Sequence, residues 1–173
     1  MSEYFTADTH AWHTNIVKYC KRPFDNAVEM TEKMATNINK VVGKTDTLYH
    51  LGDFSWGTTY SIRQFRSMIN CENIILVIGN HDRTIRKNPQ LQKELFNGVH
   101  DIYEINRKRH KIVLCHYAML SWNAQYHGSW HLYGHSHGNL EGKHRMRSMD
   151  VGVDCWDFHP ISMERVSKEM SKK

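Results

Sequence analysis

The sequence predicts an α/β fold in which a sandwich of mixed β-sheets is covered by helices. Strand-like and helix-like segments alternate up to residue 96, and consecutive strand-like segments follow from Val99. This order is typical of two β-layers with helices outside. A chain of 173 residues, of which 40% are hydrophobic, is long enough for one domain over residues 1–173 with a core that needs no disulfides.

The first half of the chain alternates between two kinds of hydrophobic pattern. Residues 26–42 are expected to be helical, because Met30, Met34, Ile38 and Val42 follow helical spacing. The continuous apolar run at 73–78 is typical of a fully buried strand. Further expected strands are 3–7 and 47–51, and further expected helices are 60–69 and 89–96.

The second half reads mainly as strands. Residues 102–105 and 112–114 flank a basic turn and are predicted to form an antiparallel hairpin. Residues 130–133 and 149–153 are predicted as strands. A last helix is expected at 163–170, with Ser162 as its N-cap.

Acidic, amide and histidine motifs follow the expected strands. They are Asp8-Thr9-His10, Gly52-Asp53, Gly79-Asn80-His81-Asp82, Cys115-His116 and Gly134-His135-Ser136-His137. Loops at the carboxyl ends of strands converge in open α/β sheets, so five distant loops can build one site. Each motif alone is a weak signal, but together they offer ligands for two metal ions. The series predicts a dinuclear metal hydrolase that acts on phosphate esters.

The motif order D-x-H, G-D, G-N-H-D, H, G-H-x-H resembles that of the calcineurin-like metallophosphoesterase superfamily. Residues 6–16, 49–54 and 150–154 are similar to the small single-domain phosphoesterases of bacteria and phages, and the resemblance covers residues 4–161. It implies a four-layer α/β/β/α sandwich of two mixed β-sheets flanked by helices. One departure is Ala11-Trp12, which stands where Phe-Gly is usual and should alter the wall of the site.

The resemblance implies two sets of metal ligands. The first metal would be held by Asp8, His10, Asp53 and His137, and the second by Asp53, Asn80, His116 and His135. Two neighbouring cations repel each other, which makes Asp53 the candidate anionic bridge, and a bridging hydroxide would attack phosphorus. Carboxylate, imidazole and amide ligands suit Mn²⁺ or iron and tolerate Zn, Ni or Co. We expect an extended backbone at 135–137, which would turn both histidines to one face.

The resemblance also implies roles around the substrate. His81 would protonate or electrostatically support the leaving oxygen, and Asp82 is the candidate to orient its ring. His13 and Arg83 are candidate substrate-binding residues, and Asn15 and Arg22 are weaker ones. Gly79 and Gly134 are expected to permit tight turns. The motif-loop aromatics Trp12, Trp56, Tyr117, Trp122 and Trp130 can stack on a nucleobase or simply pack.

Composition narrows the function. A net charge of +5 favours phosphate-bearing substrates, so we expect a small phosphomonoester or phosphodiester and favour one of a nucleotide. Two basic runs, at 107–111 and 143–147, keep a nuclease or nucleic-acid end-processing phosphatase open, although a solvated hairpin turn is the simpler interpretation of the first. A non-catalytic protein-binding scaffold is the second alternative, and retention of every ligand residue argues against it.

The same composition bears on localisation. The four cysteines are widely spaced, and the sequence has neither a membrane-length apolar run nor a secretion signal. We therefore expect a cytoplasmic protein without a membrane partner. The pattern does not choose between mono- and diesters or fix the native metal, the oligomeric state or a cellular or phage origin.

Overall fold

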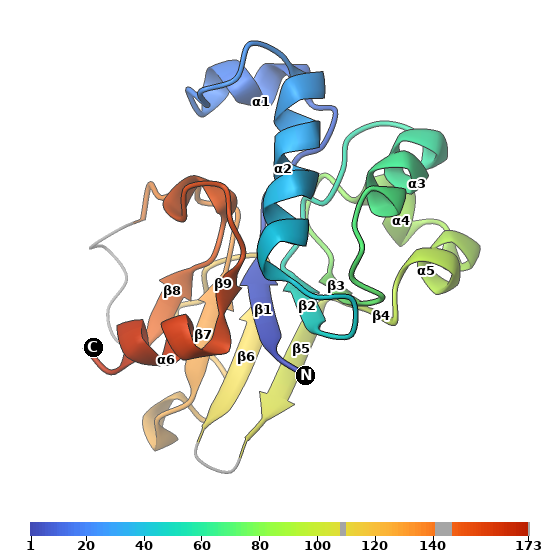
Figure 1. Ribbon diagram of the computed structural model, residues 1–173. Helices are drawn as coiled ribbons and strands as arrows, with labels where there is room; N and C mark the ends of the chain where they lie inside the picture. Colours follow the sequence, from blue (N-terminus) through green and yellow to red (C-terminus); the bar gives the residue numbers. More distant parts are fainter. Residues whose placement is uncertain (108–109, 141–146, 173) are drawn as a thin grey trace.

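The computed structural model describes residues 1–107, 110–140 and 147–172 as two mixed β-sheets flanked by helices (Figure 1). The first sheet has the order β4-β3-β2-β1-β9 and the second has the order β5-β6-β7-β8. This arrangement confirms the predicted α/β sandwich. Residues 108–109 of the first basic run and residues 143–146 of the second lie outside the described residues.

The first sheet is parallel except at one edge. Its parallel strands are β1 (Glu3–Thr6), β2 (Thr47–His50), β3 (Asn73–Val77) and β4 (Gly98–His100), and β9 (Ile161–Ser162) runs antiparallel to β1. In the second sheet β5 (Ile102–Asn106) and β6 (Lys111–Cys115) form the predicted hairpin, and β7 (Trp130–Tyr133) and β8 (Ser148–Asp150) continue in parallel. The carboxyl ends of β1, β2, β3, β6 and β7 carry the five motif loops.

The predicted strand at 149–153 is wrong in its second half. Strand β8 ends at Asp150, Gly152 makes an isolated bridge to Ala7, and Val153 begins the short 3₁₀ helix η2 (Val153–Cys155). The bridge joins the end of the second sheet to the end of β1. It brings the loops after both strands to the same place.

The helices follow the predicted order with two additions. They are α1 (Thr14–Tyr19), α2 (Ala27–Val41), α3 (Thr59–Ser67), α4 (Arg83–Arg86), α5 (Pro89–Leu95) and α6 (Met163–Met170). The six-residue α1 and four-residue α4 were not predicted, because such short helices carry little periodic signal. The Ser162 hydroxyl accepts a hydrogen bond from Arg165 N at 3.2 Å, which confirms the predicted N-cap of α6.

Two hydrophobic clusters hold the layers together. One lies between the first sheet and α2 and α3, and it includes Met30, Met34 and Leu48. The other lies between the sheets, where Phe5 and Leu132 belong to one cluster that α6 joins through Val166. Figure 1 shows α3, α4 and α5 on one side of the molecule and α6 on the other.

The far face of the second sheet is covered by the segment between β6 and β7, which contains η1 (Gln125–His127). His131 points to this face, where its Nε2 lies 3.2 Å from Tyr117 O and its ring lies 5.2 Å from that of Trp122. The segment therefore begins at the site, immediately after His116, and is anchored to the sheet by His131.

All four cysteines are free, as the sequence predicts. Within the described part of the chain no helix combines the length and the apolar character that crossing a bilayer would need. Arg107 pairs with Glu3, and the Lys111 ammonium lies 2.9 Å from Glu104, so these described members of the first basic run are bound within the chain. That pairing favours the hairpin interpretation of the run.

Candidate metal centre

The five motif loops meet above the carboxyl ends of the strands. Backbone hydrogen bonds join them directly: Asp8 N donates to Gly52 O at 3.0 Å, and Gly134 N donates to His116 O at 3.0 Å. Predicted ligands from β1, β2, β3, β6 and β7 consequently face a common centre. The sequence-based expectation that five distant loops form one site agrees with this geometry.

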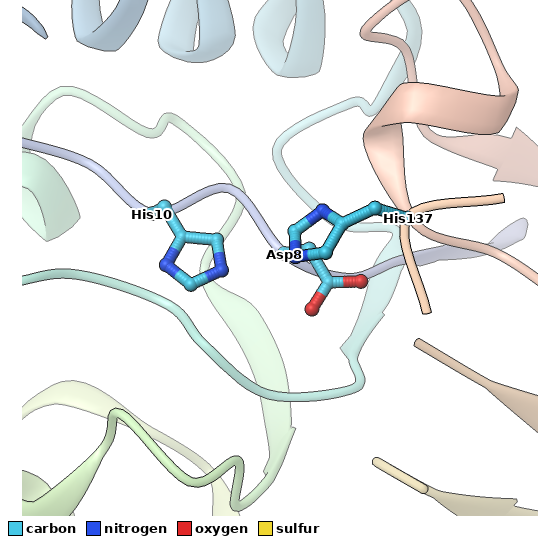
Figure 2. A group of neighbouring side chains, drawn as sticks. All are labelled: Asp8, His10 and His137. Carbon is cyan, nitrogen blue, oxygen red and sulfur yellow. The ribbon is translucent and has the colours of Figure 1, made fainter. Parts of the chain in front are cut away.

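Two groups of potential ligands lie side by side in this centre. The first ligand group is Asp8, His10 and His137, and the second ligand group is Asp53, His116 and His135; within each group the ligand atoms lie within 4.8 Å of one another. Figure 2 shows Asp8 and His10 on one segment and His137 reaching toward them from another. The grouping matches the division into two metal sites that the resemblance implies.

Asp53 lies between the two groups. Its Oδ2 is 3.4 Å from His10 Nε2, in the first group, and 3.5 Å from His116 Nε2, in the second. The amide oxygen of Asn80 is 3.0 Å from His116 Nε2, which brings Asn80 to the second group as well. A carboxylate in this position has the placement required of a bridging ligand.

The backbone of the ligand loops is strained. Asp8, His10, Asp53, His135 and His137 all have positive φ, between 47° and 66°. Side chains other than glycine rarely adopt this region, and such outliers gather where a site over-determines the backbone. The expected extended conformation at 135–137 is wrong: alternating left-handed residues send His135 to the second ligand group and His137 to the first.

The motif glycines begin tight turns and also allow close approach of neighbouring strands. As expected from the sequence, Asp82 N donates to Gly79 O at 3.4 Å and Ser136 N donates to Gly134 O at 2.7 Å, although neither glycine has positive φ. A Cβ at Gly79 would lie 2.2 Å from Asp53 Oδ1, and one at Gly134 would lie 2.5 Å from the Ala7 Cβ and 2.7 Å from Asp8 Oδ2. The backbone at both glycines thus lies so close to the carboxylates of Asp53 and Asp8 that a side chain larger than hydrogen does not fit.

Hydrogen bonds fix the orientation of two imidazoles. His116 Nδ1 donates to Leu51 O at 2.7 Å, and His137 Nδ1 donates to Asp154 Oδ2 at 2.7 Å. In each case the partner accepts from Nδ1–H, so Nε2 is the nitrogen left to bind a metal once it has lost its proton. Such partners commonly set the tautomer of metal-binding histidines.

The expected role of Asp82 is wrong. Its carboxylate is buried and accepts hydrogen bonds from the backbone N–H groups of Gly79, Asp53 and Phe54, at 2.8, 2.8 and 2.9 Å. Both oxygens are therefore directed at the backbone, not at the ring of His81. Asp82 ties the loop after β3 to the loop after β2 and so positions Asp53.

A chain of polar contacts that the sequence analysis did not identify supports the first ligand group. The buried Arg22 donates to both Asp154 oxygens, at 2.8 and 2.7 Å, and to Asp8 O at 2.7 Å. Asp154 in turn holds His137. Arg22 thus acts as a structural residue and not as part of a phosphate-binding wall.

Asp150 has a similar role on the neighbouring loop. It accepts hydrogen bonds from Ser136 Oγ at 2.5 Å and Gly138 N at 3.2 Å, which brackets His137. In the sequence, Asp150 and Asp154 appear only as part of a family-like segment. Their long-range contacts carry no local signal.

Cys20, His137 and Asp154 form a third cluster of potential ligands. The Arg22 guanidinium occupies both Asp154 oxygens here, and its positive charge opposes a cation at the same place. This arrangement favours a supporting role for Asp154 over a third metal site.

The donor atoms fit a pair of metal ions. The buried His10 Nε2 has no hydrogen-bond partner among the described residues, which is costly unless a ligand binds there. Burial lowers the pKa of His10 well below its ordinary value, so its imidazole is neutral and can donate a lone pair. Burial raises the pKa of Asp8 to about 7, so a nearby cation would offset the cost of its charge.

Candidate substrate-contacting residues lie beside the first ligand group. The ring of His81 is exposed and 5.3 Å from that of His10, and the His13 ring is 5.4 Å from His10. Arg83 is exposed at the start of α4, and Asn15 is exposed on α1. Trp12, at the unusual motif position, donates from Nε1 to Ser61 O at 3.0 Å and therefore anchors the loop.

Comparison with known proteins agrees with this geometry. The family model described as calcineurin-like phosphoesterase matches residues 4–131. The chain belongs to the calcineurin-like phosphoesterase family. Members of this family typically bind divalent metals, and the two ligand groups supply potential ligands for them.

Two relatives match nearly the whole chain. An uncharacterized protein of Methanocaldococcus jannaschii is 31% identical over 98% of this chain and 91% of its own length. The crystal structure of a protein of unknown function from Aquifex aeolicus superposes with a TM-score of 0.77 at 28% identity, covering 97% of this chain and 98% of that one. The similarity supports the fold over the full length.

We predict that Arg22→Met weakens both the fold and the metal centre. Breaking a buried ion pair costs about 3–5 kcal/mol, because Asp154 would be left without its cation. Metal affinity should fall about 10- to 100-fold, since Asp154 orients His137. Denaturant unfolding and metal titration measure the two effects.

Arg63→Met is the matched control, because Arg63 makes an equally short pair with Glu94, but on the surface. It should change little, since solvent screens exposed pairs. Equal stability of the two variants would contradict a structural role for Arg22.

We also predict that metal binding releases protons. Although burial opposes protonation, the hydrogen bond to Asp53 raises the pKa of His116 to about 9, and the hydrogen bond to Asp154 raises that of His137 to about 10. At neutral pH the metal-free protein therefore holds both protons, which a metal must displace. Affinity should rise with pH from about 6 to 9.

Calorimetric metal titration in buffers of different ionisation enthalpy measures this release. His137→Gln should release fewer protons than the original protein, because it lacks one of the two histidines whose pKa is raised. A titration without net proton release would overturn the expectation.

Proposed function

We propose that this calcineurin-like phosphoesterase is a hydrolase that binds two divalent metal ions and cleaves a phosphate ester, preferably of a nucleotide. The observation that carries the proposal is Asp53, whose Oδ2 lies within 3.5 Å of a histidine of each ligand group. We assign Asp8, His10, Asp53 and His137 to one metal and Asp53, Asn80, His116 and His135 to the other. The donor set contains no thiolate, which favours Mn²⁺ or iron over softer metals.

When bound, the metals supply an activated water and neutralise charge on the phosphate oxygens. The protein positions them through the strained loops and the Asp82, Arg22 and Asp154 contacts. His13 and Arg83 are proposed to bind the phosphate. His81 is proposed to give a proton to the leaving oxygen, since its ring is exposed beside His10.

We predict that His81→Ala affects poor leaving groups most. General acid catalysis contributes about 100- to 10,000-fold when the leaving oxygen needs a proton. Hydrolysis of a diester with an alkyl leaving group should fall by this factor. Hydrolysis of bis-p-nitrophenyl phosphate should fall much less, because nitrophenolate leaves without a proton. An equal loss on both substrates would argue that His81 has another role.

The proposal is tested by metal reconstitution. The protein is stripped with chelator, titrated with Mn²⁺, iron, Zn²⁺, Ni²⁺ and Co²⁺, and assayed with bis-p-nitrophenyl phosphate. We expect about two metals per chain and metal-dependent hydrolysis. Metal binding without hydrolysis under any of these conditions would favour the non-catalytic scaffold.

A nuclease is distinguished by its salt dependence. Activity on oligonucleotides that falls steeply with salt would indicate many phosphate contacts, whereas a small nucleotide substrate gives a shallow dependence. The internal pairing of Arg107 and Lys111 favours the small substrate.

A further inference from the structure

Two half-exposed aromatic side chains stand at the edges of the metal centre, one beside each ligand group. Trp56 is 43% exposed, and its ring stacks on that of His13 with the centroids 4.1 Å apart and the planes 7° apart. The same indole lies 5.2 Å from the ring of His81. It therefore adjoins both histidines that we place at the phosphate on the side of the first ligand group.

Tyr117 stands beside the second ligand group. It is 46% exposed, and its ring lies 5.0 Å from His116 and 4.9 Å from His135, edge-on to both. It follows His116 directly and begins the segment that His131 anchors on the far face of the sheet. The ring is thus held next to the second group while much of its surface stays open to solvent.

The other motif-loop aromatics are committed to packing. Trp130 is buried in the core between the sheets. Trp122 donates from Nε1 to Ser129 O at 3.3 Å, and Trp12 donates to Ser61 O. Of the five aromatics singled out in the sequence, Trp56 and Tyr117 both contact histidines of the centre and keep much of their surface exposed to solvent.

We propose that the substrate is a nucleoside phosphodiester with a planar group on each ester oxygen, the leaving group packing on Trp56 and the retained nucleoside on Tyr117. This inference rests on the proposed hydrolase function and deepens it. The leaving group is assigned to Trp56 because His81, the proposed proton donor, touches that ring. A monoester would use only one of the two surfaces.

The reaction is a hydrolysis. A water molecule loses one proton to solvent and its oxygen bonds to phosphorus, while the bond from phosphorus to the leaving oxygen breaks. His81 supplies a proton when the leaving oxygen needs one and takes a proton back from solvent. The products are a nucleoside monophosphate and an alcohol or phenol. Stacking of one base on an aromatic side chain contributes roughly 5- to 150-fold in affinity, so each ring should have a measurable share of specificity.

Tyr117 is tested with two substrates that share a leaving group. Thymidine 5′-(4-nitrophenyl phosphate) and methyl 4-nitrophenyl phosphate differ only in the retained group. We expect Tyr117→Ala to lower the ratio of their kcat/KM values about tenfold, mainly through KM for the thymidine ester. Tyr117→Phe should restore the ratio. Tyr126→Ala is the control, because Tyr126 is 94% exposed on the same segment and has no place in the centre.

Trp56 is tested with two leaving groups on one nucleoside. The nitrophenyl and trifluoroethyl esters of thymidine 5′-phosphate share the retained group, and chromatography of thymidine 5′-phosphate follows both reactions. We expect Trp56→Ala to lower the preference for the planar leaving group about tenfold and Trp56→Phe to preserve most of it. Metal content should be unchanged in both alanine variants.

The outcomes separate this inference from the function on which it rests. If the original protein hydrolyses neither nitrophenyl diester with any metal, the proposed function fails and the inference fails with it. If it hydrolyses both and the alanine variants leave the substrate ratios unchanged, the inference alone is overturned. A loss of metal from either variant would also overturn it, because the ring would then be a support for His13 or His116.

Discussion

Asp53→Asn is expected to lower kcat/KM for bis-p-nitrophenyl phosphate by about three orders of magnitude or more, because a charged bridge between two cations supplies several kcal/mol. Burial opposes ionisation of Asp53, but the hydrogen bond and charge of His116 hold its pKa well below the ordinary value, so the site contains a carboxylate at all working pH values. An amide in its place cannot balance two cations. Metal content should fall to about one per chain or fewer.

The substitution is well suited to isolate charge from structure. Asp53 Oδ1 accepts a hydrogen bond from His81 N at 2.8 Å, and the amide oxygen of asparagine can keep it. Asp101→Asn is the matched control, since Asp101 is an exposed carboxylate paired with Arg86. Mass spectrometry for metals and a kinetic assay give the two readouts. Full metal content and activity in Asp53→Asn would remove Asp53 from the centre.

The second large effect is expected for Gly79→Ala, a change of one methyl group. The added Cβ would lie 2.2 Å from Asp53 Oδ1 and 2.4 Å from Asp53 N. Neither atom can move away easily. Asp82 Oδ2 accepts hydrogen bonds from both Asp53 N and Gly79 N at 2.8 Å, and Asp53 Oδ1 accepts one from His81 N at 2.8 Å. Gly79 does not have positive φ, so the conformation itself suits alanine and the cost comes from contact.

Overpacking of this kind costs about 1–3 kcal/mol, which for a chain of this size lowers Tm by roughly 3–10 °C. The larger consequence should be loss of metal, since relief of the clash displaces Asp53. Gly43→Ala is the control, because its Cβ would meet only the side chain of Asp46, with Oδ2 at 3.1 Å, and Asp46 is not among the metal-centre residues. Calorimetry and metal analysis follow both variants, and a Gly79→Ala protein with full metal content would show that the contact is tolerated.

Local pattern carried much of the fold prediction. Helix α2 was predicted within one residue at each end because its apolar residues repeat with helical spacing, and Asn26 accepts hydrogen bonds from Val28 N and Glu29 N at its start. Helices α1 and α4 and strands β4 and β9 were missed, because each is shorter than two full periods of its own pattern, about 3.6 residues for a helix and about 2 for a strand.

The sequence by itself determined the order of the motifs and their position after strands. These features are local, and parallel strands then bring such loops to one edge. The tertiary structure alone decided how the site is held. Arg22 reaches Asp154 across 132 residues, and Asp82 binds the backbone of Asp53 instead of the neighbouring His81.

The same distinction explains the glycines and the strained histidines. A glycine at a strand end predicts a turn, and Gly79 does begin one. The tertiary structure adds a second requirement there, because the Asp53 carboxylate from the neighbouring strand's loop lies within contact distance. Left-handed backbone at His135 and His137 is imposed by contacts that sequence spacing does not contain, among them Asp8 with His135 N and Asp154 with His137. Periodicity encodes which residues meet at the edge of a sheet, and only long-range packing sets the directions in which they point.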